Sequence, residues 1–251
     1  MKTSVRSAFV AVAMVAALAT TAATATAVAA APSDSGIKAE VQRQLARLDL
    51  GSSHITVDVR DGVVTLSGAV PSLWLKEEAV RRALKAGDVK SLVADLTIAK
   101  AENDQALARE VGDRIRHYDL YTVYDIIDGR VRNGAVTLTG AVTEPKKAAD
   151  VFERIAKVRG VQAIDNRIAV LPTSQPDDRL RVSIATAIYR DEAFQDYSMV
   201  DPPIHVIVNN GHVTLVGVVR SQIERLKAAS IAGLTSGVLV VDNKVQLAGV
   251  R

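Results

Sequence analysis

Apolar and polar residues alternate in three short runs of nearly identical sequence. Each run opens with Asp-Gly or Asn-Gly and continues as a Val-Thr-Leu-x-Gly segment, and the copies span residues 61–70, 133–142 and 210–219. This is the strongest short-range signal for a β-hairpin, because both central residues of a type I′ turn need a positive φ. We therefore predict a tight turn followed by a strand in each copy. The turn glycines are Gly62, Gly134 and Gly211.

A second glycine lies on the inward-facing side of each of these strands. Glycine weakens a strand and often marks the close approach of another backbone. We predict that a helix crosses the sheet at this point, so that the glycine provides clearance and has a packing role rather than a catalytic one. These helix-clearance glycines are Gly68, Gly140 and Gly217.

The same order of helical and strand patterns surrounds each hairpin. An amphipathic helix and a β-rich run precede it, and a second helix and a closing strand follow it. The closing segment begins at the same distance after the second glycine each time, from 68 to 88, from 140 to 160 and from 217 to 237. We predict an α+β fold of three tandem α-β-β-α-β units with a period of about 70 residues. Each unit should be a three-stranded mixed sheet covered on one face by two helices.

Two copies depart from the common pattern. The first strand of the second copy has Gly129 at its central inward position, so we expect it to be the weakest of the three first strands. The first copy has Asp88 and Ala94 in its closing segment, where the other copies have glycine and asparagine. Its closing strand is therefore the least typical of the three.

The repeated motif resembles that of the BON domain, a module named for bacterial osmotically inducible and nodulation proteins. The resemblance rests on the turn glycine, the Val-Thr-Leu-x-Gly strand and the closing Gly-Val-x-x-Val/Ile-x-Asn-x-Ile/Val segment, and it covers nearly all of the chain after residue 36. The whole is similar to OsmY-type secreted proteins, with one additional unit. This resemblance implies a non-enzymatic periplasmic protein that associates with phospholipid and protects the envelope under osmotic stress.

The first 31 residues have the pattern of a secretory signal peptide. Lys2 and Arg6 precede an apolar stretch, and small residues occupy the expected cleavage site. We expect export to the periplasm and three units at 32–100, 101–172 and 173–251. The chain has no cysteine, so we expect neither disulfides nor a lipid anchor.

The charge balance gives no reason to expect a nucleic-acid partner. The chain has 31 basic and 28 acidic residues, and removal of the signal peptide with Lys2 and Arg6 leaves 29 against 28. Proteins that bind nucleic acid usually carry a clear basic excess on the binding domain.

No constellation of residues indicates an enzyme, a cofactor or a metal site. There is no cysteine nucleophile, serine elbow or Walker loop, and the four histidines fall at non-equivalent positions of the repeat. The acidic residues between 191 and 201 lack the ordered spacing of a calcium loop. We therefore expect a protein that binds other molecules without transforming them.

Aromatic residues are concentrated before the first strands of the second and third units. Six of the nine in the chain lie there: Tyr118, Tyr121, Tyr124, Tyr189, Phe194 and Tyr197. Side chains with an apolar body and a polar tip suit a membrane or protein interface, and Trp74 at the start of a helix is a further candidate. The alternative is that these residues cap small cores or fill contacts between units.

The second helix of the second unit carries a basic group that could contact lipid headgroups. It comprises Lys146, Lys147, Arg154 and Lys157, with acidic residues interspersed, so an ordinary solvated face is the alternative. The leading hypothesis is a phospholipid membrane surface as the partner. The alternative hypothesis is a multivalent interaction or chaperone-like module for envelope proteins, with no small-molecule substrate in either case.

Overall fold

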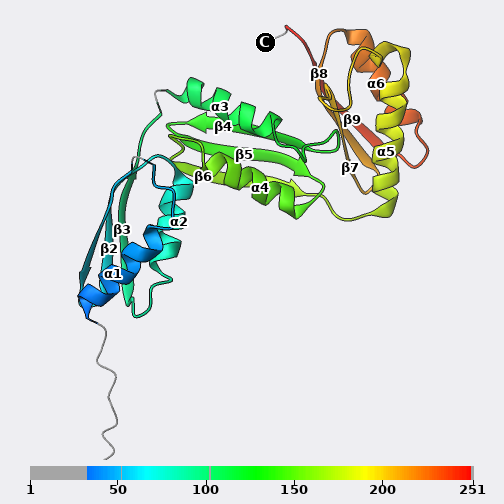
Figure 1. Cartoon of the computed structure of the whole chain (residues 1–251). Coiled ribbons are helices and arrows are strands. Elements are labelled where there is room, and N and C mark those ends of the chain that lie inside the picture. Colours follow the sequence, from blue (N-terminus) through cyan, green and yellow to red (C-terminus); the bar gives the residue numbers. More distant parts are fainter. Residues whose placement is uncertain (1–32, 52, 102, 250–251) are drawn as a thin grey trace, which may run out of the picture. The chain divides into compact units, whose positions relative to one another are not determined.

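The computed structural model describes residues 33–51, 53–101 and 103–249, which form three units with the same order of elements (Figure 1). Each unit runs helix, strand, strand, helix, strand, and only the third adds a short 3-10 helix among the described residues. The fold class predicted from the repeat is therefore confirmed. The expected signal peptide, residues 1–31, lies outside the described residues.

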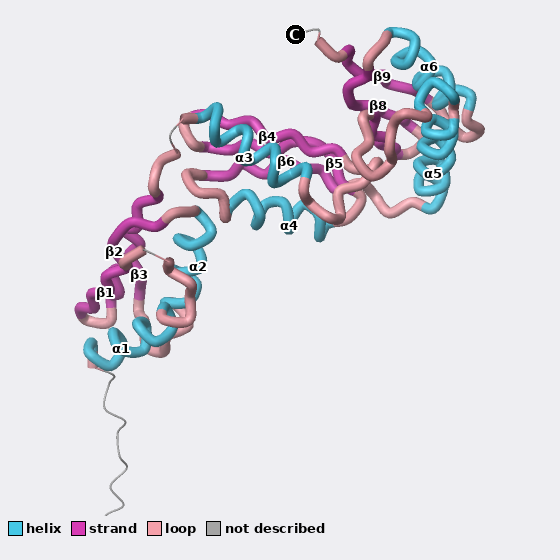
Figure 2. Tube along the Cα trace, turned by 45° about the horizontal axis from the view of Figure 1, so that its top comes forward, coloured by secondary structure: helices cyan, strands magenta, loops and turns pink. Residues whose placement is uncertain are grey.

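The helices and strands occur in the order that the repeat predicts (Figure 2). The first unit contains α1 (Asp34–Leu45), β1 (Ile55–Arg60), β2 (Val63–Val70), α2 (Leu73–Ala83) and β3 (Ser91–Ile98). The second contains α3 (Asp104–Arg116), β4 (Ile126–Arg132), β5 (Ala135–Val142), α4 (Pro145–Ala156) and β6 (Ala163–Val170). The third contains α5 (Gln175–Arg190), η1 (Glu192–Phe194), β7 (Ile204–Asn209), β8 (His212–Val219), α6 (Gln222–Leu234) and β9 (Val240–Leu247).

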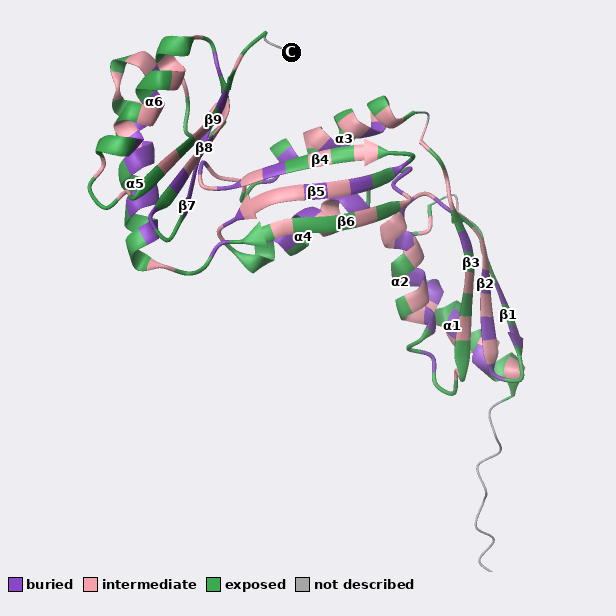
Figure 3. Cartoon of the chain, turned by 180° about the vertical axis from the view of Figure 1, so that it is seen from behind, coloured by how far each residue is buried: buried purple, intermediate pink, exposed green. Residues whose placement is uncertain are grey.

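Each unit has a three-stranded sheet with the second strand in the middle. The first two strands pair antiparallel through the hairpin, and the closing strand pairs parallel with the middle one. Apolar side chains on alternate positions of the middle strand and on one face of each helix form a separate core in every unit. In the second unit the edge strands β4 and β6 are mostly exposed or half-buried, as their colours show in Figure 3.

The hairpin turns have the predicted backbone conformation. Gly62, Gly134 and Gly211 have φ values of 79°, 75° and 75°, and the residue before each of them also has a positive φ, between 51° and 52°. Two successive positive φ angles define the type I′ geometry that joins two strands with their natural twist.

The prediction that Gly68, Gly140 and Gly217 make room for a crossing helix is wrong. A Cβ atom built at these positions would lie 2.3, 2.0 and 1.9 Å from the backbone carbonyl oxygen at the entrance to the neighbouring strand. Their φ angles are also positive, at 136°, 125° and 146°. The close neighbour is therefore the antiparallel strand, and a side chain is excluded by both contact and conformation.

Helix clearance belongs instead to Gly129 on β4. A Cβ atom there would lie 2.7 Å from Val111 Cγ1 on α3, so the helix approaches the sheet at this glycine. Strand β4 nevertheless has seven residues in uninterrupted register with β5. In the first unit, Asp88 adopts a φ of 67° at the position where the other units have Gly160 and Gly237. The backbone is thus the same, and the closing strand β3 forms normally.

An aspartate at the start of the first helix holds the hairpin turn in every unit. The carboxylate of Asp34 accepts hydrogen bonds from the N–H groups of Asp61 and Gly62 at 2.8 and 2.9 Å. Asp104 binds the second turn at 2.6 and 2.9 Å, and Asp177 binds the third at 2.8 and 2.9 Å. We refer to this arrangement as the carboxylate clamp. Sequence reasoning missed it, because the separation of aspartate and turn glycine differs between units, at 28, 30 and 34 residues.

We expect Asp34→Ala to destabilise the first unit by about 2–4 kcal/mol, because it removes two charge-assisted hydrogen bonds and leaves two turn N–H groups without an acceptor. The fluorescence of Trp74, the single tryptophan of the chain, reports the first unit during urea unfolding. Asp58→Ala is the matched control, because its carboxylate pairs with Arg60 on an exposed surface and should be worth at most about 1 kcal/mol. Equal effects of the two substitutions would contradict a structural role for the clamp.

Candidate functional site

The segment between α3 and β4, residues 118–125, gathers three of the predicted contact residues next to the third unit. We refer to it as the aromatic segment; it contains Tyr118, Tyr121 and Tyr124. Backbone bonds from Tyr121 N to the Tyr118 carbonyl at 2.8 Å and from Asp125 N to the Thr122 carbonyl at 3.0 Å fold it into consecutive turns. It is therefore a structured element rather than an open loop.

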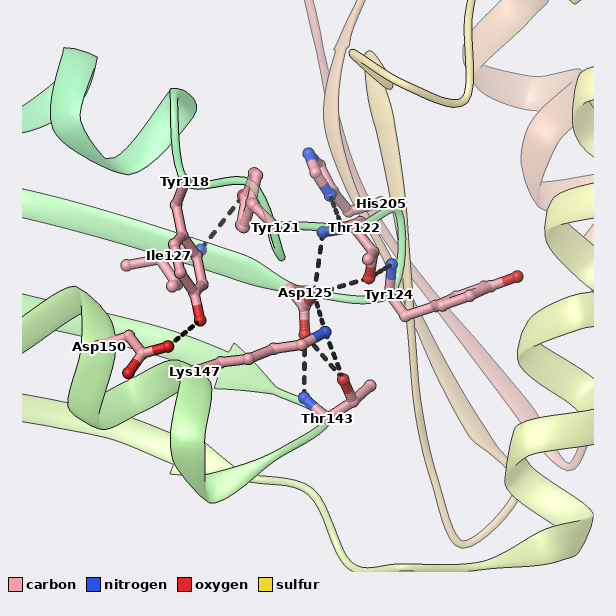
Figure 4. A network of polar contacts seen from close by, with 10 residues as sticks. All are labelled: Tyr118, Tyr121, Thr122, Tyr124, Asp125, Ile127, Thr143, Lys147, Asp150 and His205. Carbon is pink, nitrogen blue, oxygen red and sulfur yellow. Dashed lines mark hydrogen bonds and ion pairs between the residues drawn. The ribbon is translucent and has the colours of Figure 1, made fainter.

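A buried ion pair anchors the end of this segment (Figure 4). Lys147 Nζ lies 2.7 Å from Asp125 Oδ2, and the two side chains are 7% and 0% exposed. The carboxylate also accepts hydrogen bonds from the backbone and hydroxyl groups of Thr122 and Thr143. Burial alone would raise the pKa of the Asp125 carboxyl, but these donors outweigh it and hold the pKa below its usual range. Lys147 is thus committed to the interior, which corrects the expectation that it belongs to a basic surface.

Two of the tyrosines are also held by specific contacts. The Tyr118 hydroxyl donates to Asp150 Oδ2 at 2.7 Å, and the Arg154 guanidinium lies 5.5 Å from its ring. The Tyr121 hydroxyl accepts a hydrogen bond from the N–H of Ile127 at 3.4 Å, and burial raises the pKa of this phenol to about 12. These side chains therefore fix the approach to β4.

The aromatic segment also contacts the third unit directly. The N–H of Val206 on β7 donates to the Val123 carbonyl at 2.8 Å. Val123 is only 3% exposed and packs within the core of the third unit, and Tyr124 packs against the same core. The ring of Tyr121 lies 5.2 Å from that of His205. The second unit thus supplies an apolar side chain to the core of the third.

A cavity of about 860 Å³ opens beside this contact. Its walls include Tyr118, Tyr121, Met199, Pro203, His205 and Val218. Aromatic residues and methionine are enriched at protein interfaces, and cavities of this size lie within the range of ligand sites.

The remaining predicted contact residues occupy core or paired positions. Phe194 is fully buried in the third unit, which removes it from the candidate surface contacts. The Tyr197 hydroxyl donates to Glu224 at 2.9 Å, and Lys157 Nζ lies 5.0 Å from the Trp74 ring, across the contact between the first and second units. Lys146 pairs with Asp150, and Lys157 pairs with Glu153. These positions fit the alternative that the residues complete cores and contacts between units.

The largest exposed apolar feature of any second helix lies on α6, which sequence reasoning did not single out. Ile223, Leu226 and Leu234 are 76%, 58% and 85% exposed. At 100° per residue they fall within an arc of about 80°, on the side opposite the buried Ala228 and Ala232. We refer to these three residues as the α6 strip.

The equivalent helices of the other units do not carry three large apolar residues at the matching positions. By alignment of the repeat, the α6 strip corresponds to Trp74, Glu77 and Lys85 in the first unit and to Lys146, Ala149 and Lys157 in the second. A comparison of the outward face of the three second helices would have revealed this difference from sequence. Within the described ranges, no helix is long and apolar enough to cross a membrane, and no cluster of three potential metal ligands occurs.

Comparison with known proteins agrees with the repeat. The family model described as BON domain matches residues 33–100, 103–172 and 176–249. The chain is a BON-domain protein. The three BON domains cover nearly the whole of its described part, and proteins with such domains are known from the bacterial envelope and periplasm.

Two solved structures are similar to this BON protein over most of its length, at low sequence identity. One is CdsD, described as a structural protein of the type III secretion system of Chlamydia trachomatis, with 15% identity, a TM-score of 0.25, and coverage of 83% of this chain and 90% of that chain. Another is the PrgH periplasmic domain, with 16% identity, a TM-score of 0.21, and coverage of 82% and 98%. No curated protein sequence matches the chain.

We expect Lys147→Met to destabilise the second BON domain by about 3–5 kcal/mol, because it leaves the Asp125 carboxylate buried without its cation. Urea unfolding followed by far-UV circular dichroism measures the loss. Adding Asp125→Asn should recover part of it, since the neutral amide oxygen can still accept from Thr122 and Thr143. Lys146→Met is the control, because the neighbouring Lys146 is exposed and its loss should cost less than about 1 kcal/mol. A double variant no more stable than Lys147→Met would argue against an unpaired charge as the cause.

Proposed function

We propose that this BON protein is a non-enzymatic periplasmic protein that associates with phospholipid membrane surfaces and protects the envelope under osmotic stress. The observation that carries the proposal is the α6 strip, where three large apolar side chains lie on the outside of a folded domain. Large apolar side chains exposed along one side of a helix favour a contact with a membrane or with another protein.

The surroundings of the strip are compatible with a lipid headgroup region. Glu224 is the single acidic residue of α6, and its carboxylate is engaged by the N–H groups of Arg220 and Ser221 and by the Tyr197 hydroxyl. Arg220 and Lys227 are exposed beside it and form surface ion pairs with Asp196 and Asp191. Such exposed pairs are weak and can exchange a carboxylate for a lipid phosphate at small cost.

The apolar contribution is large enough to matter. Removal of one Leu or Ile side chain from water contributes about 1.5–3 kcal/mol. Partial insertion of the α6 strip into the interface would therefore supply a few kcal/mol, comparable to other reversible interfacial anchors. The polar face of α4 offers no such apolar contribution to the binding free energy. This favours the third domain as the part that contacts the membrane.

A multivalent interaction or chaperone-like module for envelope proteins is the second candidate function. The cavity lined by Met199, Pro203 and Val218 favours it, because its walls are mainly apolar and partly formed by the exposed Val200 region. Three domains in one chain would also raise the effective concentration of weak sites.

We expect Leu226→Glu to lower the binding of the mature protein to anionic phospholipid vesicles by about tenfold or more, since a charge replaces a side chain that inserts into the interface. Co-sedimentation with vesicles, with and without anionic lipid, measures the bound fraction. Val93→Glu on β3 is the matched control, because Val93 is also half exposed but lies in the first domain. Absence of binding to either vesicle type would exclude the proposal, and equal losses in both variants would exclude the α6 strip as the contact.

The second candidate function, binding of envelope proteins, predicts an effect at the cavity instead of at the α6 strip. Val218→Glu at the cavity should reduce capture of envelope proteins by the immobilised protein several-fold and leave vesicle binding unchanged, because the charge lies in the cavity wall and outside the α6 strip. Quantitative mass spectrometry of captured periplasmic proteins measures the effect. Capture that depends on Leu226 and not on Val218 would count against the cavity as the interaction site.

A further inference from the structure

Strand β7 is an edge strand, and several of its outward backbone groups have hydrogen-bond partners outside the sheet. The Tyr189 hydroxyl accepts from the N–H of Ile204 at 3.1 Å and donates to its carbonyl at 2.7 Å. Arg181 Nη2 donates to the Val208 carbonyl at 2.6 Å. Between these two, the N–H of Val206 donates to Val123 of the second domain. Covering of this kind protects an edge strand from pairing with other chains.

The central contact of this edge comes from a neighbouring domain and therefore can be released. For β1 and β4, no backbone hydrogen bond joins the outward edge to a residue of another domain within the part of the chain that the structure describes. Residues 122–124 thus act on β7 alone, with Val123 inserted in the core and its carbonyl on the strand edge. We refer to residues 122–124 as the latch.

A histidine lies at the point where the latch meets β7. His205 is 7% exposed, its Nδ1 lies 3.3 Å from the Thr122 carbonyl oxygen, and its ring contacts that of Tyr121. His54, His117 and His212 are all exposed. His205 is therefore the one buried histidine among the described residues.

Of the charged groups around His205, the buried carboxylate is already paired and the others are exposed to solvent. Asp125 is the nearest buried carboxylate, and it is already paired with Lys147. Asp201 precedes β7 on the exposed side, and Arg116, His117 and Asp119 line the same cavity. The antiparallel partner of His205 on β8 is Val216, which carries no charge.

We infer that the latch opens when His205 takes up a proton, so that mild acid releases the third domain from the second and uncovers the β7 edge. A neutral ring with its proton on Nδ1 donates to the Thr122 carbonyl and stacks beside Tyr121. A protonated ring would bring a positive charge and a second N–H group into the same buried position, which is costly without a new partner.

The direction of the pH effect follows from burial. Burial lowers the pKa of His205 from its ordinary value, and this outweighs the opposing influence of the Thr122 carbonyl, Asp125 and Asp201. The closed latch is then fully stable above the pKa of the released histidine, about 6.5, and weakens as the pH falls below it. At pH 5.0 the open population can rise by up to about 30-fold relative to neutral pH.

Residue-resolved amide hydrogen exchange of the mature protein tests this inference. The protection of Val206, corrected for the intrinsic pH dependence of exchange, should fall by up to about 30-fold between pH 7.5 and pH 5.0. The amide of Leu66 in the middle strand of the first domain is the internal reference. Unchanged protection of Val206 relative to Leu66 would overturn the inference.

Variants separate His205 from other acid effects. His205→Phe keeps an aromatic ring beside Tyr121 and should make Val206 protection independent of pH, and His205→Gln serves the same purpose if the Phe variant does not fold. His117→Gln, in the same cavity wall, should respond to acid as the wild type does. An equal fall in the His205 variants, or an NMR titration of His205 at or above the ordinary histidine pKa of about 6.5, would overturn the inference.

Discussion

The carboxylate clamp is the interaction on which each domain depends. A two-residue turn with two positive φ angles leaves adjacent N–H groups pointing the same way, and the aspartate in the first helical turn accepts both. These two hydrogen bonds tie the first helix to the hairpin, and both elements precede the second helix and the closing strand in the sequence. With the turn fixed, the middle strand has a defined register with both of its neighbours. Equivalent positions of the middle and closing strands are paired in all three domains.

On this common framework the three domains differ in two places. The segment between the first helix and the first strand has nine residues in the first and second domains, is rich in tyrosine in the second, and is longer and contains η1 in the third. The outward face of the second helix is polar in α4 and apolar in α6. Both places lie outside the sheet, and the segments before the first strands also contribute Val123 and Phe194 to the core of the third domain. Divergence there changes the surface of a domain and its contacts with neighbours while the fold stays the same.

Much of the fold could be predicted from the sequence because its signals are local. The Asn-Gly turn at Gly134 and the alternating strand after it can both be recognised within ten residues of sequence. The constant distance from the second glycine to the closing segment shows that the same unit is repeated. The role of Gly140 could not be derived in this way, because the atom that excludes its side chain is the carbonyl of Ile126, fourteen residues away in the chain. The clamp by Asp104 spans thirty residues with a variable separation, so no fixed spacing pointed to it.

The candidate site was harder to predict for the same reason. Tyr118 and Lys147 belong to the same domain, and because one is a tyrosine and the other a lysine we predicted that both lie on a contact surface. Their partners Asp150 and Asp125 become apparent only when the helix, the aromatic segment and the sheet are assembled. Ile223 and Leu226 are apolar residues in a helical pattern, and the sequence pattern does not distinguish a buried face from an exposed one unless the three repeats are aligned.

The insertion of Val123 has a consequence for how this chain can be divided or shuffled. A fragment cut at the repeat boundary would carry a third domain without the Val123 side chain in its core and without the bond from Val123 to the edge of β7, whereas a fragment that contains both the second and third domains keeps them. Duplicated modules that exchange a side chain in this way lose their independence, because any later deletion or permutation must move the pair together. The second and third repeats therefore depend on each other for a complete core, although each retains a complete set of strands and helices.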